Sequence, residues 1–311
     1  MHVLASAPPW LLAGEVAAAC SALAWAIAGI VFARLHPGLS AGALNLGKNL
    51  AGCLCFAVFL FLRDGTGMPL GVEGEALLFL VLAGVIGLGI CDIYLLRSLM
   101  AIGPQRMSLI FCLAPVLVAL GALLPPFREH PGALTWLGMG ICLGGIVLAI
   151  VELGDPRTAT GDVRQGVRDA IIAAVLQAVA VLLTRHAMQS ASVDIAAAAT
   201  VRLYAGTVAL ILIGLVGRRL VAWYRQLRHP WTPAKVFGAA TLGTFIGIWL
   251  QQLGISWAAN TGVATTLNAL TPIYLLPLSA LFLGERRRPI AWIATAVALG
   301  GIALMALDAG S

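Results

Sequence analysis

The sequence predicts an all-α membrane protein with ten transmembrane helices arranged as two inverted five-helix repeats. Of its 311 residues, 60% are hydrophobic and only 10% are charged, and the mean hydropathy is +0.98. A soluble domain carries about 25% charged residues, so this chain could not cover a water-facing surface. Glycine is abundant, with 35 residues, and small residues let helices approach closely in lipid.

Ten apolar segments are long enough to cross the hydrocarbon core, which takes about 20 helical residues. The expected spans are approximately 11–34, 40–62, 76–100, 106–125, 133–153, 168–188, 195–216, 236–257, 262–283 and 290–308. Turns rich in Gly, Pro or charge separate them. The first apolar segment is too long for the core of a signal peptide and follows no basic stretch, so we interpret it as an uncleaved span.

The two halves of the chain resemble each other in several places. "LGKNLAG" at 46–52 corresponds to "TVRLYAG" at 200–206. The corresponding positions are Lys48 and Arg202, Gly52 and Gly206, Glu15 and Asp169, Pro115 and Pro272, and the glycine pairs Gly144–Gly145 and Gly300–Gly301. Because these matches occur in the same order in both halves, we interpret them as an internal repeat.

An odd number of spans in each half requires the second repeat to enter the bilayer in the opposite orientation. We expect a first repeat at 1–153, a polar linker at 154–167 and a second repeat at 168–311. Inverted repeats are typical of secondary transporters, in which the binding site lies between the halves near the middle of the membrane.

The segment "ALTPIYLLPLSALFLGERRRPIAWIATAVALGGIAL" at 269–304 resembles the last two helices of EamA-type members of the drug/metabolite transporter superfamily. Gly284 and Glu285 stand at that family's Gly-Glu turn. The first half departs from the pattern, because "PPFREHP" replaces the turn and Glu129 only approximately takes the place of Glu285. The resemblance covers nearly the whole chain. It implies a ten-span permease that exports or exchanges small organic molecules such as amino acids and their relatives.

Lys48 and Asp92 are candidate partners inside the bilayer. A lysine at the centre of a membrane helix costs roughly 2.5 to 3.5 kcal/mol on insertion-type scales. Asp92 lies at a similar depth on the antiparallel neighbouring span, and an ion pair would reduce the cost of both charges. The pair could hold the fold alone, Lys48 could instead extend to the interface, and Asp92 could bind substrate or couple transport to protons.

Arg202 holds the corresponding position in the second half. The neighbouring span offers Gln251 and Gln252 there but no carboxylate. Its anionic partner could be Glu15, which lies in the first span near the same membrane face, or a carboxylate or phosphate on the substrate. Because a guanidinium fork suits either group, we expect Arg202 to face a central cavity.

Polar stripes on the ninth and fourth spans indicate further cavity residues. The ninth span carries Thr261, Thr265, Asn268 and Pro272 at helical spacing, and the fourth carries Pro104, Ser108, Cys112 and Pro115. Pro115 and Pro272 are expected to kink their helices, because proline in a span frees a carbonyl. Ser108 could equally be a packing residue. Other candidates for the cavity wall are Trp25, Tyr94, Gln177 and Trp249.

Motifs for chemistry are lacking in the sequence. It contains no P-loop, no HExxH and no Ser-His-Asp arrangement, and its six cysteines are scattered through apolar segments. We therefore expect no enzyme activity, no cofactor and no metal, with transport running on a gradient. The expected partners are a small-molecule substrate and the lipid bilayer, with no nucleic acid, and the protein is expected to be a monomer or weak homodimer.

Three alternatives remain open from the sequence. One is a transporter of a phosphorylated or lipid-linked metabolite. The second is a multi-span lipid-handling protein or enzyme, which would call for paired carboxylates or His-rich clusters at one interface, and the sequence lacks these. The third is a scaffold or receptor, which would not need buried charges at equivalent positions of the two repeats.

The distribution of basic residues predicts the orientation in the plasma (inner) membrane. Loops on the side of both termini carry three Lys and Arg residues, and loops on the other side carry thirteen. Because cytoplasmic loops collect Lys and Arg, we expect both termini outside, although the resembled family commonly has both in the cytoplasm. The segment 217–235 is amphipathic and is expected to lie along the cytoplasmic surface.

Overall fold

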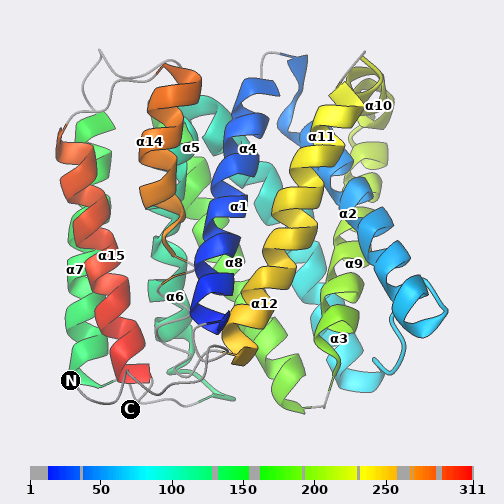
Figure 1. Cartoon of the computed structure of the whole chain (residues 1–311), viewed down its shortest axis with the longest axis horizontal. Coiled ribbons are helices and arrows are strands. Elements are labelled where there is room, and N and C mark those ends of the chain that lie inside the picture. The colour runs from blue at the N-terminus through cyan, green and yellow to red at the C-terminus, as the bar shows by residue number, and fades with distance from the viewer. Residues whose placement is uncertain are drawn as a thin grey trace.

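The computed structural model is a bundle of membrane helices standing side by side (Figure 1). It describes residues 13–35, 38–127, 132–153, 162–190, 193–229, 232–257, 267, 269–284 and 289–309. The first half contains α1 (Ala13–Leu35), α2 (Ala41–Asp64), α3 (Gly74–Gly84), η2 (Val85–Cys91), α4 (Asp92–Ile102), α5 (Pro104–Phe111), α6 (Leu113–Gly121) and α7 (Ala133–Leu153). The second half contains α8 (Val163–Ser190), α9 (Ile195–Val216), α10 (Leu220–Leu227), α11 (Thr232–Ala240), η3 (Thr241–Ile246), α12 (Gly247–Trp257), α14 (Thr271–Leu283) and α15 (Pro289–Ala309).

The helices correspond to the predicted spans. Among the described residues, seven helical segments are long and apolar enough to cross a membrane, and three shorter apolar helices cover 133–149, 271–283 and 289–305. Each predicted span overlaps one of these segments, and the short α10 lies outside them. The chain is therefore an all-helical, multi-pass integral membrane protein.

The first helix of the chain packs against the second half. Ser21 Oγ of α1 donates to Gly247 O, and Trp25 Nε1 donates to Gly243 O, both at 2.7 Å. Residue numbers rise along α1 while they fall along η3 and α12, so the two spans are antiparallel. η3 and α12 belong to the third span of the second half, which crosses the membrane in the same direction as its first span, α8. α1 and α8 therefore run in opposite directions, and the repeats are inverted.

The first helix of the second half packs in turn against the first half. Along α8, Asp169 lies beside Arg97 of α4 and Gln177 lies beside Cys91 of η2. Each repeat therefore contributes its first helix to the other repeat, and the two sequence halves do not form separate bundles.

The third span of each half contains a π-helix, η2 in the first and η3 in the second. A π-turn inserts one extra residue into the helical ladder and leaves carbonyls without their ordinary partners. Neither was expected from the sequence. Glycines permit a close approach here, because a Cβ on Gly206 of α9 would lie 2.7 Å from Gly84 O and one on Gly89 would lie 3.2 Å from Gly206 O.

Backbone contact through glycine also joins the last helices of the two halves. α7 and α15 are antiparallel neighbours, and a Cβ on Gly145 would lie 2.5 Å from Ala298 N. Gly301 faces the backbone of Gly138 and Cys142 equally closely. One glycine of each pair that marks the repeat, Gly145 or Gly301, therefore lies at this helix crossing.

Candidate functional site

One face of α2 carries three buried polar side chains. Asn45, Lys48 and Asn49 are spaced at i, i+3 and i+4, which places them together on the helix surface. Lys48 is 8% exposed, and both asparagines are fully buried. Such groups are retained inside a membrane helix only where partners compensate for their desolvation.

Asp92 supplies the charge partner for Lys48, as predicted. Lys48 Nζ lies 2.7 Å from Asp92 Oδ2 and 2.9 Å from Asn49 Oδ1. Asp92 is the first residue of α4, directly after the π-helix η2. The ion pair is therefore fixed to the point where the third span changes from π to α geometry.

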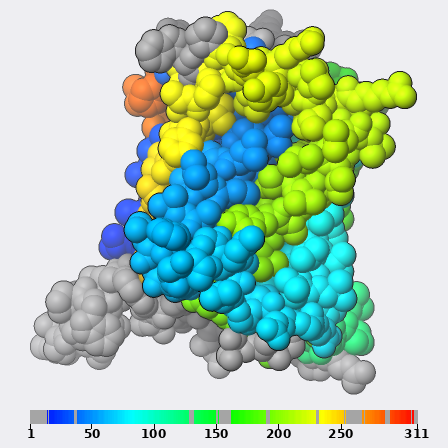
Figure 2. Space-filling model, turned by 90° about the vertical axis from the view of Figure 1, so that its right-hand side faces the viewer, coloured from blue at the N-terminus to red at the C-terminus, as the bar shows by residue number. Residues whose placement is uncertain are grey.

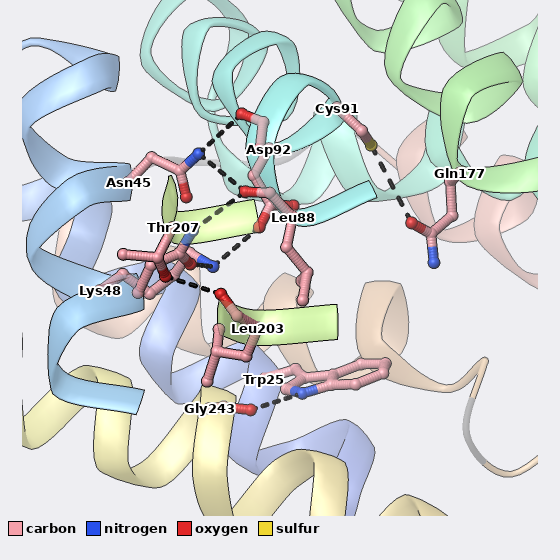
Figure 3. A network of polar contacts seen from close by, with 12 residues as sticks. Trp25, Asn45, Lys48, Leu88, Cys91, Asp92, Gln177, Leu203, Thr207 and Gly243 are labelled. Carbon is pink, nitrogen blue, oxygen red and sulfur yellow. Dashed lines mark hydrogen bonds and ion pairs between the residues drawn. The ribbon is translucent and has the colours of Figure 1, made fainter. Parts of the chain in front are cut away.

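Two asparagines hold the carbonyls of the π-helix. Asn45 Nδ2 donates to Leu88 O at 3.1 Å and Gly89 O at 3.2 Å, and Asn49 Nδ2 donates to Leu88 O at 3.1 Å. Figure 3 shows Asn45 and Lys48 reaching from α2 toward Leu88 and Asp92. The sequence interpretation missed both asparagines, although their spacing around Lys48 was a usable signal.

Arg202 lies on α9, which packs against the same π-helix. Its Nε atom is buried without a hydrogen-bond partner, and the guanidinium forms no ion pair with a described residue. A Cβ on Gly84 would collide with the backbone of Arg202, and Asp92 lies close enough to act on the guanidinium electrostatically. Among the described residues, this centre therefore contains the cationic side chains of Lys48 and Arg202 and the carboxylate of Asp92.

Other predicted residues lie around this centre or beside it. Cys91 Sγ contacts Gln177 Oε1 at 4.0 Å, next to Asp92 (Figure 3). The guanidinium of Arg97 lies 5.5 Å from the centre of the Tyr94 ring. Trp25 is bound to η3 through Gly243.

The remaining candidates form no hydrogen bond with Lys48 or Asp92 in the part of the chain that the structure describes. The ring of Trp249 lies 4.7 Å from that of Phe59, so one side of this ring packs between α12 and α2. Ser108 Oγ is buried and has no hydrogen-bond partner among the described residues, and Gln251 is half-buried.

The two prolines lie next to helix ends. The fourth span breaks at Cys112, between α5 and α6, three residues before Pro115. Pro272 stands in the first turn of α14. The backbone of Thr265 and Asn268 and the side chains of Glu15 and Gln252 lie outside the described residues.

No metal centre is present in the described part of the chain, where no three His, Cys, Asp or Glu side chains gather. The geometry instead offers hydrogen bonding and charge at the contact between spans of both repeats. Such a site can bind a polar solute reversibly, and the fold is that of a membrane transporter with inverted repeats.

Comparison with known proteins identifies the family. The EamA-like transporter family matches residues 12–151 and 166–307, and the chain belongs to this family. It is therefore a transporter and not an enzyme. A solved structure described as "Crystal structure of protein" shares the fold, with 18% identity, 95% coverage of each chain and a TM-score of 0.59. No curated protein matches the chain.

Proposed function

We propose that this protein is a secondary transporter, an exporter or exchanger of small polar organic metabolites such as amino acids or related compounds. The observation that carries the proposal is the buried charge centre, in which Lys48 and Asp92 pair and Arg202 lacks a partner among the described residues. A substrate carboxylate is the group that would neutralise the extra positive charge. Arginine binds it through two parallel N–H donors.

Alternating access follows from the way the repeats pack. α1 packs with the third and fourth spans of the second repeat, and α8 packs with those of the first. We propose that these two groups of helices rock about a site between the repeats, with α2 and α9 carrying Lys48 and Arg202 to it. Gln177, Tyr94, Trp25, Ser108 and Gln251 are proposed to line the route, together with Thr265, Asn268, Gln252, Trp249 and Glu15.

A phosphorylated or lipid-linked metabolite is the second candidate substrate. Arg202, which forms no ion pair with a described residue, favours it as much as a carboxylate, because a pair of phosphate oxygens suits the two donors of a guanidinium equally well.

The proposed repeat boundaries remain 1–153 and 168–311, joined by 154–167, and the matched segments 12–151 and 166–307 support them. We also propose the plasma (inner) membrane as the location and a monomer or weak homodimer as the state.

Counterflow into proteoliposomes tests the function. Proteoliposomes that contain the purified protein would be loaded with amino acids, with the corresponding amines that lack the carboxylate, or with phosphate monoesters of similar size. We expect the carboxylate or phosphate series to exchange and the amines to fail. Equal transport of the amines would overturn the proposed role of Arg202.

Substitution of the arginine separates binding from folding. Arg202→Gln should abolish exchange, and Arg202→Lys should weaken it by keeping the charge but losing the fork. Arg63→Gln, on α2 near the membrane face, is the matched control and should transport normally. Wild-type exchange by a monodisperse Arg202→Gln protein would contradict the proposal.

A further inference from the structure

The short helix α10 is fixed rigidly across one end of the bundle. Its Trp223 ring fills the space left by two glycines, touching Gly42 of α2 and lying 2.8 Å from the position of a Cβ on Gly214 of α9. Gln226 Oε1 accepts hydrogen bonds from Ser40 N at 2.9 Å and Ser40 Oγ at 2.8 Å. The side chains on the inner face of α10 therefore hold this helix against the bundle.

The residues in and beside α10 are strongly basic. Five exposed cationic side chains gather here: Arg218 and Arg219 directly before the helix, Arg225 within it, Arg228 directly after it and Lys235 of α11. None of them forms an ion pair with a described residue, and the sequence contains no Asp or Glu between 195 and 284. The described residues thus provide no carboxylate paired with the positive charges of this surface.

Exposed apolar side chains border the basic surface. Val216 is 86% exposed and Val221 is 63% exposed, and the Arg228 guanidinium lies 5.6 Å from the centre of the exposed Tyr224 ring. Figure 2 shows this yellow-green region capping the upper ends of α2 and α9 on the outer surface. Since α9 ends and α11 begins on either side of α10, the helix stands where the spans leave the hydrocarbon.

We propose that α10 and its flanking residues form a docking surface for anionic phospholipid headgroups. Arginine side chains bind phosphate oxygens through paired donors, the exposed valines and tyrosine fit the edge of the acyl region, and basic side chains near an anionic membrane surface each add to binding. A lipid is favoured over a soluble anion because the same surface presents apolar groups beside the charges.

Lipid binding to the purified full chain tests the proposal. The protein in neutral detergent would be titrated with dioleoyl phosphatidylglycerol or dioleoyl phosphatidylcholine, and retained lipids would be counted by native mass spectrometry. We expect preferential retention of phosphatidylglycerol, weakened at high salt. Arg225→Gln with Arg228→Gln should lower the affinity by about fivefold for each arginine removed.

A matched variant removes the same charge from another place on the same end of the molecule. Arg164→Gln with Arg168→Gln at the start of α8 should keep the phosphatidylglycerol preference, and Arg97 remains there as a partner for Asp169. The single variants Arg225→Gln and Arg228→Gln give a graded series if the double variant is unstable. Unchanged binding in these variants, equal loss in the α8 control, or displacement of the lipid by inorganic phosphate alone would overturn the proposal.

Discussion

Lys48 shows how a single charged side chain is kept inside the bilayer. Its ammonium is held by Asp92 at 2.7 Å and by Asn49 at 2.9 Å. The depth of the two charges on neighbouring spans predicted the ion pair, because an isolated charge would be too costly. The amide partner was not predicted, since an asparagine carries no charge that demands compensation.

Removing one member of the pair should be worse than removing both. Lys48→Ala or Asp92→Ala alone leaves a buried charge unpaired, at a cost of about 3–5 kcal/mol, whereas the double variant should recover part of the loss. Folded yield and unfolding temperature in detergent measure this effect. Arg63→Ala, which breaks a pair at the membrane face, is the control and should change little. Independent, additive losses would show that the two charges do not interact.

The helix elements are organised around their irregular segments. η2 and η3 interrupt the third span of each half, and side chains from other helices donate hydrogen bonds to carbonyls of both segments. The π segments could not be predicted from hydropathy, because one extra residue in a turn changes neither the apolar length nor its average composition.

The asparagines on α2 are expected to hold η2 in place. Asn45→Leu removes the donor to Gly89 O, and Asn49→Leu removes one donor to Leu88 O and an acceptor for Lys48. Each change should lower the free energy of unfolding by about 1–2 kcal/mol, measured by denaturant titration. Leu54→Ala, at an exposed position of the same helix, controls for size. A neutral or stabilising result for Asn45→Leu would mean that the amides do not stabilise the π-helix.

The two glycines of each closing pair should differ sharply. Gly145→Ala would place a methyl group 2.5 Å from Ala298 N and should cost about 1–3 kcal/mol through overpacking. Gly144→Ala meets nothing within 4 Å and should be nearly neutral. Gly301→Ala and Gly300→Ala repeat the comparison on α15. Equal effects within a pair, by thermal unfolding, would argue against the crossing.

The whole molecule is built by exchange of the first helix between repeats. α1 packs against η3 and α12, and α8 packs against α3, η2 and α4. Hydrogen bonds from Ser21 and Trp25 attach α1 to the third span of the second half. Each half predicted from the sequence is therefore one copy of the repeat with one orientation in the membrane. The helices that pack together come from both halves.

The orientation in the membrane is testable at this scale. The basic surface of α10 lies at the end of the bundle opposite the start of α1 and the end of α15 (Figure 1). Because basic loops stay in the cytoplasm, we predict both termini outside. A C-terminal alkaline phosphatase fusion should be active and a C-terminal fluorescent protein dark. Bright fluorescence with an inactive phosphatase would reverse the assignment.

The sequence by itself determined the spans, the internal repeat and the glycine pairs that mark it, and it indicated the charge pair as one of the arrangements open to Lys48. These follow from local properties: apolar length, repeated residues, and the cost of a charge in lipid, which hold whatever the neighbouring helices are. Only the tertiary structure decided the π-helices, the amides that bind their carbonyls, the lack of an ion pair between Arg202 and any described residue, and the exchange of α1 and α8. Those features depend on which helix faces which, and in a uniformly apolar chain hydropathy does not distinguish one neighbour from another.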